Sequence, residues 1–202
     1  MMEQPLRLLR MLRILCNGAT ALLLLGLAPL ISASGSPEGL KEHLFDISQN
    51  ASLVLAAPAN WKVAARLDPN SNAPVFVFAP PQGTSFAVMV TPLPDTILEA
   101  GFNEPEKMRT QLEYNRSKLL SRPAGATLPI REFTAPNGAG YYFELQNSVP
   151  DQEGFRFLIQ GIRGLPHMLL LFTVLTRTKE ADEKQAALEM IRGARETLKG
   201  PD

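Results

Sequence analysis

The apolar run at residues 168–175 is the strongest structural signal in this sequence. It is too short for a long helix, and an apolar run broken only by one threonine is typical of a strand covered on both faces. Just before it, Phe155, Phe157 and Ile159 occupy every second position, which predicts a neighbouring strand with one apolar face. Residues 161–166 hold two glycines and a proline and predict the turn between these strands. We therefore expect a hairpin whose second strand is central in a sheet.

Residues 180–199 carry the pattern of an amphipathic helix. Acidic side chains come early in this stretch and basic ones late, as the helix dipole favours. The apolar side chains recur at spacings of three and four: Ala187, Met190, Ile191, Ala194 and Leu198. We expect this stripe to pack on the preceding sheet, so that truncating Ile191 or Leu198 destabilises the domain.

The rest of the chain adds more strands and one further helix. Residues 36–94 contain short apolar or alternating segments separated by turn formers, which is the pattern of an antiparallel meander. Asn103 can cap a second helix, whose apolar stripe starts at Met108. Asn137 and Gly138 predict a hairpin, because both central positions of a type I′ turn need positive φ. These elements predict an α+β fold with a central antiparallel β-sheet flanked by helices.

The N-terminal segment has the pattern of a secretory signal peptide. Three arginines precede an apolar run at residues 19–31, and small residues follow. We assign residues 1–34 to the signal peptide, 35–42 to a flexible tether and 43–202 to a single domain. Cys16, the only cysteine, lies in the leader, so the exported body has no disulfide and no thiol nucleophile. The alternative is an uncleaved membrane anchor, which would then be the only contact with the membrane; in either case the body is periplasmic or secreted.

Charge and motif content exclude several classes of function. Basic residues and acidic residues each number 20, so no positive excess is present to neutralise phosphates, and nucleic-acid binding is not expected. His43 and His167 have no carboxylate or thiol at a metal-ligand spacing, and no nucleophile-elbow serine occurs. We therefore expect no catalytic residue, no metal site and no cofactor, although carboxylates distant in sequence could still converge in the fold.

Aromatic residues offer the only candidate binding site. Trp61, the sole tryptophan, is expected to fill the core, and the alternative is a ligand platform. With Phe86, Tyr141, Phe143 and Phe155 it forms a candidate pocket for a small apolar molecule, between the sheet and the central helix.

The order of elements resembles the Mog1/PsbP-like proteins, which include bacterial envelope proteins of the DcrB type. The resemblance rests on the tryptophan-containing segment at residues 58–62, the central helix, the hairpin at Asn137 and Gly138, and the final strand with its alanine-rich helix. It covers roughly residues 44–199 and implies an α/β/α sandwich.

Members of that family mostly act as binding or accessory proteins without a shared catalytic set, so no functional residue is carried over. We expect an exported, non-catalytic accessory or binding protein that acts on an envelope protein partner. The alternatives are a periplasmic carrier of a small molecule or lipid, and a hydrolase with a convergent site.

Overall fold

The computed structural model describes residues 39–69, 71–120, 128–136, 138–147, 149–179 and 181–199. The predicted leader, residues 1–34, and Asn137 of the predicted hairpin lie outside the described residues. The elements in chain order are β1 (Leu40–Asp46), β2 (Ala51–Pro58), β3 (Lys62–Leu67), β4 (Pro74–Ala79), β5 (Phe86–Pro94), the short 3-10 helix η1 (Asp95–Ile97), α2 (Pro105–Leu120), β6 (Arg131–Ala135), β7 (Gly138–Gln146), β8 (Phe157–Gly164), β9 (Met168–Thr176), α3 (Asp182–Gly193) and β10 (Arg195–Leu198). Because β1 starts at Leu40, residues 40–42 of the predicted tether belong to a strand.

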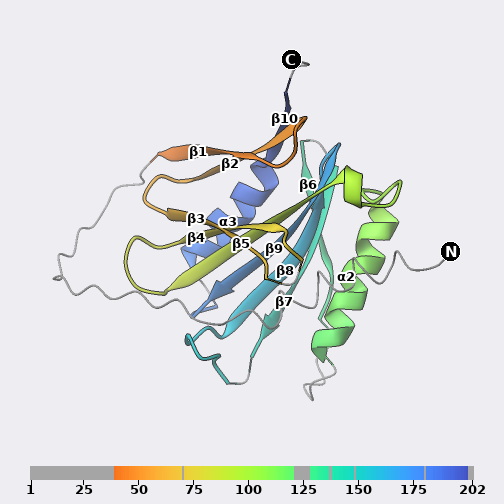
Figure 1. Cartoon of the computed structure of the whole chain (residues 1–202). Helices are drawn as coiled ribbons and strands as arrows, with labels where there is room; N and C mark the ends of the chain where they lie inside the picture. Colours follow the sequence, from red (N-terminus) through yellow and green to blue (C-terminus); the bar gives the residue numbers. More distant parts are fainter. Residues whose placement is uncertain are drawn as a thin grey trace.

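The described strands form two antiparallel sheets rather than one. The smaller has the order β1-β2-β10 and the larger the order β3-β4-β5-β9-β8-β7-β6. The predicted meander at residues 36–94 is therefore divided, with β1 and β2 in the smaller sheet and β3 to β5 in the larger one (Figure 1). The chain end completes the smaller sheet, because β10 pairs with β2 from Arg195 opposite Val54 to Leu198 opposite Ala51.

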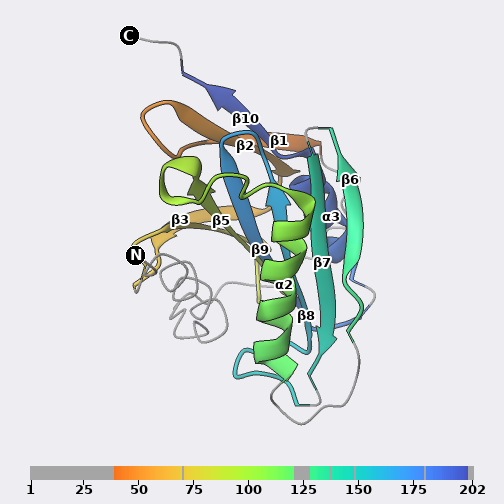
Figure 2. The ribbon, with the colours of Figure 1, turned by 90° about the vertical axis from the view of Figure 1, so that its right-hand side faces the viewer.

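The predicted α/β/α sandwich with flanking helices is wrong. Strands make up most of the described regular structure, and the described residues contain only two α-helices. α2 contacts β7 and β8 on one face of the seven-stranded sheet (Figure 2). On the opposite face α3 contacts β2 of the smaller sheet as well as β9 and β6. The layer opposite α2 is therefore built jointly by a sheet and a helix.

β9 is the central strand, as predicted, and lies between β5 and β8. Its side chains are almost all buried. Leu170, Phe172 and Val174 belong to the core shared with α3 and the smaller sheet, whereas Leu169 and Leu171 belong to the core beneath α2. Burial on both faces explains the nearly unbroken apolar run.

β8 continues to Gly164, so the turn predicted at residues 161–166 begins too early. The actual turn is tight, and the Leu165 N–H donates to the Met168 carbonyl at 2.9 Å. Gly161 lies opposite Phe172 in the sheet, and the Phe172 ring fills the space that a side chain at position 161 would need. Glycine at this position therefore permits a close cross-strand approach and does not form a turn.

α3 ends at Gly193, earlier than predicted. Ala194 leaves the helix with a ψ of 138°, and the following residues form β10. Ile191 and the rest of the predicted stripe are buried, but Leu198 is 62 % exposed in β10, so its assignment to the stripe is wrong. Pairing with β2 gives hydrogen-bond partners to backbone groups that would otherwise remain unpaired at the edge of that strand.

A fully buried arginine contacts the end of α3. The guanidinium Nη1 of Arg163, in β8, donates to the carbonyl of Ile191 in the last turn of the helix. A positive charge is favourable at a helix C-terminus. Burial lowers the pKa of Arg163 to about 10. This contact joins the larger sheet to the point where the chain turns into β10.

Candidate functional site

The five aromatic residues predicted to line a pocket do not gather around one cavity. Trp61 and Phe86 pack together in the core on the α3 face, with ring centroids 4.7 Å apart. Tyr141 and Phe143 lie in the separate core beneath α2. Phe155 precedes β8 and is buried. Trp61 is itself buried, which confirms its predicted place in the core.

Side chains fill the interface between the larger sheet and α2, where the sequence suggested a ligand pocket. Met108 and Leu112 of α2 are 1 % and 0 % exposed. They pack in one cluster with Tyr141 and Leu171 of the sheet. At these positions the interface is packed core.

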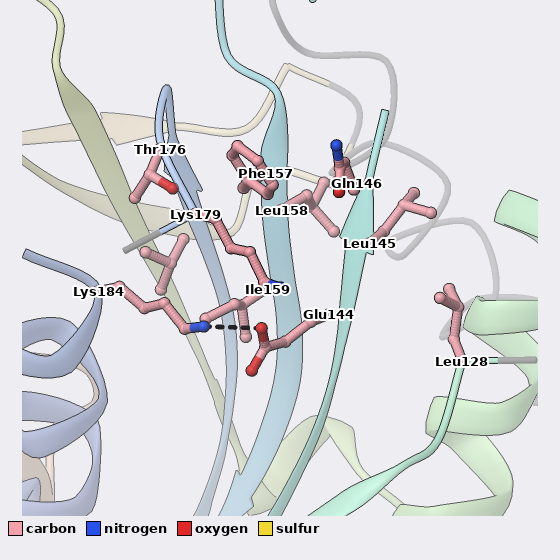
Figure 3. A pocket seen from close by; sticks show the side chains of 11 residues that line it. Leu128, Glu144, Leu145, Gln146, Phe157, Leu158, Ile159, Thr176, Lys179 and Lys184 are labelled. Atoms are coloured by element: carbon pink, nitrogen blue, oxygen red, sulfur yellow. Dashed lines mark hydrogen bonds and ion pairs between the residues drawn. The ribbon is translucent and has the colours of Figure 1, made fainter. Parts of the chain in front are cut away.

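A hollow of about 250 Å³ lies mainly on the α3 face of the sheet, at one end of β7, β8 and β9 (Figure 3). Phe157 and Ile159 of β8 and Val174 of β9 form an apolar floor. Lys179, in the segment before α3, and Lys184, in the first turns of α3, also line the hollow. The hollow therefore combines apolar surface with amino groups.

Strand register explains how this floor forms. Ile159 pairs with Glu144 of β7 on one side and with Val174 of β9 on the other, so these three side chains make one row on the same face. Phe157 pairs with Thr176 and forms part of the next row. Because α3 begins only at Asp182, these rows lie beside the start of the helix (Figure 3).

The hollow extends to the edge of the larger sheet. β6 pairs with β7 only as far as Tyr142, so β7 beyond that residue has no strand on its outer side in the described part of the chain. Leu128, which precedes β6, lines the hollow together with Leu145 and Leu158. Its wall at this edge is therefore apolar.

Of the residues that the structure describes, two with ammonium groups and one with a carboxylate line the hollow. Lys184 Nζ lies 2.7 Å from Glu144 Oε2, and the two side chains are 25 % and 26 % exposed. The other carboxylate oxygen of Glu144 accepts from Arg131 Nη1 at 3.2 Å. Lys179 has no carboxylate within ion-pair distance among the described residues. Among the described residues, the positive charge of Lys179 is therefore not matched by a carboxylate.

The two histidines lie outside this hollow. The ring of His43 packs edge-on against Phe78 at 5.8 Å, and burial, followed by the charge of Lys41, lowers the pKa of His43. His167 Nδ1 lies 3.2 Å from Asp95 Oδ2 at the start of β9. Within the described ranges, no three metal-binding side chains gather closely enough to hold a metal ion.

Sequence reasoning missed the two lysines of the hollow. The alternation of Phe157 and Ile159 did indicate a shared face. No local pattern, however, shows that Lys184 meets Glu144, because the two residues belong to different elements and meet only through the fold. Lys179 lies between two elements, where neither helical nor strand periodicity applies.

No protein-family model matches the chain, and no curated protein is significantly similar to it in sequence. The resemblance to the Mog1/PsbP-like proteins therefore stays a prediction. In the part of the chain that the structure describes, none of the helices has the length and apolar character needed to cross a membrane.

Proposed function

We propose that this protein is an exported, non-catalytic binding protein of the cell envelope that holds a small ligand in the hollow beside α3. The observation that carries the proposal is the apolar floor of Phe157, Ile159 and Val174 in a hollow of about 250 Å³. For comparison, an engineered apolar cavity of roughly 150 Å³ binds benzene. The hollow is therefore large enough for the apolar body of a small molecule.

Export is inferred from the predicted leader, and binding is inferred from the shape and composition of the hollow. Ligand sites are concave, mostly apolar and supplied with a few polar groups that fix orientation. Thr176, Glu144 and the two lysines are polar groups of this kind at the edge of an apolar floor. This proposal moves the carrier site from the α2 side of the sheet to the α3 side.

Binding of N-phenyl-1-naphthylamine, a neutral apolar dye whose emission rises in apolar surroundings, tests this proposal. The full chain is produced with its leader in an exporting host and purified from the envelope. We expect saturable binding of one dye molecule per chain. Because Phe157 lies in the floor, Phe157→Asp should weaken binding about tenfold, whereas Leu67→Asp, at a side chain 61 % exposed on β3, should not change it.

A second variant tests the site independently, in case Phe157→Asp impairs folding. Gln146 is exposed and lines the hollow, so Gln146→Trp places a bulky ring there without changing the core. We expect it to reduce dye binding as well. The proposal is rejected if the wild-type protein shows no saturable binding, or if all variants bind the dye as the wild type does.

A second candidate function, docking of an envelope protein, is favoured by β1. Leu40 and Leu44 are 72 % and 65 % exposed on the same side of this strand, and β1 pairs only with β2 among the described residues. An extended apolar segment of a partner could add to this free edge. Crosslinking in the exporting host should capture one partner with the wild type and lose it with Leu44→Glu. Equal capture by both proteins would reject this function.

A further inference from the structure

We infer that the ligand of the hollow is a small amphiphilic carboxylate, with its apolar body on the Phe157–Val174 floor and its carboxylate at Lys179. This inference rests on the proposed binding function and adds the chemical class of the ligand. It combines an apolar floor, an ammonium group that has no ion-pair partner in the described part of the chain, and the volume of the hollow.

Lys179 is the group that would receive the negative charge. It lines the hollow, and Figure 3 shows its side chain extending over the strands toward Ile159. Lys179 is exposed, so its ammonium group stays in water while its carbon chain covers apolar surface. A carboxylate there would form a charge-assisted hydrogen bond at the rim of the hollow.

The neighbouring ion pairs place the ligand's carboxylate at Lys179. Lys184 is already paired with Glu144, which also contacts Arg131. Lys184 and Arg131 thus share one carboxylate, whereas Lys179 has none among the described residues. The single ammonium group of Lys179 is matched by one carboxylate of a ligand.

The volume limits the apolar body. A hollow of about 250 Å³ exceeds the roughly 150 Å³ that accommodates benzene. It is nevertheless below the roughly 300–1,000 Å³ typical of pockets for drug-sized ligands. A compact ring system or a short chain therefore fits better than a long-chain lipid.

Displacement of bound N-phenyl-1-naphthylamine by octanoate and by 1-octanol tests the inference on the full, exported chain. The two competitors share a chain length and differ in charge. We expect octanoate to displace the dye at lower concentration than 1-octanol, although it is the more water-soluble of the two. High salt should weaken octanoate alone, because it screens the ion pair.

Lys179→Met keeps the length of the side chain and removes its charge. It should raise the octanoate concentration needed for displacement about two- to fivefold, as expected for an exposed ion pair, and leave 1-octanol unchanged. Lys62→Met, at an exposed lysine of β3, is the matched control and should behave as the wild type.

The outcomes separate this inference from the function on which it rests. If the dye binds but Lys179→Met responds to octanoate as the wild type does, the carboxylate assignment fails and the binding function stands. If octyl phosphate displaces the dye at lower concentration than octanoate, the headgroup is a phosphate and the inference is overturned. If the dye does not bind the wild type, both fail.

Discussion

Replacing Gly161 by alanine tests the packing of the central strands. A Cβ at position 161 would meet the Phe172 ring and would lie 2.6 Å from the backbone carbonyl oxygen of Tyr141. The ring can shift, but the carbonyl is fixed by the pairing of β7 with β8. Overpacking of this kind destabilises a core by about 1–3 kcal/mol. We expect Gly161→Ala to reduce the free energy of unfolding by that amount.

The matched control is the same change at Gly193, the last residue of α3. A Cβ there meets nothing within 4 Å, and alanine is favoured over glycine in helices by about 0.5–1 kcal/mol. Urea unfolding followed by circular dichroism compares the two variants. With a slope of about 2 kcal/mol per molar urea, their midpoints should differ by roughly 1 M or more, with Gly161→Ala lower. Equal midpoints would refute the close approach of Phe172 to Gly161.

Three further changes test the remaining structural claims. Ile191→Ala should reduce the free energy of unfolding by about 2–5 kcal/mol and Leu198→Ala by less than about 0.5 kcal/mol, because only Ile191 is buried. Equal losses in urea unfolding would show that Leu198 is buried with the helix stripe after all. Burial lowers the pKa of His43 below 6.5, so the unfolded chain binds more protons than the folded one, and the free energy of unfolding falls as the pH drops through that value. His43→Gln should flatten this decline in urea unfolding measured between pH 7.5 and 5. An unchanged dependence on pH would contradict the lowered pKa of His43. Trp61 is 8 % exposed, so its fluorescence should be blue-shifted and resist quenching by iodide, whereas strong quenching would contradict its burial.

Local sequence patterns predicted those elements whose burial requires a particular spacing of apolar residues. The strand at residues 168–175 was predictable because burial on both faces requires apolar side chains at consecutive positions. The burial of Ile191 was predictable for a similar reason, since a surface helix must cover its apolar stripe. Trp61 was correctly placed in the core by its size and apolarity.

Elements decided by distant contacts were not predictable. Gly161 reads as a turn residue, but the ring of Phe172 from the next strand fills the space above it. Leu198 continues the helical spacing, yet the edge of β2 offers backbone hydrogen bonds that draw the chain end into a sheet. β10 thereby joins β1 and β2 in a second sheet, whereas the predicted α/β/α sandwich has helices alone on the faces of one sheet.

The candidate site was only partly predictable for the same reason. The shared face of Phe157 and Ile159 follows from alternation within one strand. Lys179 and Lys184 reach this floor because the chain returns over the sheet after β9. Four of the five aromatic residues chosen from sequence are buried on two opposite faces of the sheet, where they form part of the cores.

Amide chemical-shift mapping with octanoate, on the isotopically labelled full chain, tests most directly whether the hollow is the binding site. The account predicts that the largest shifts fall on residues 157–159 and 174–179 and on Lys184, with little change in α2. Shifts centred on Met108 and Leu112, or spread evenly over both faces of the sheet, would contradict it.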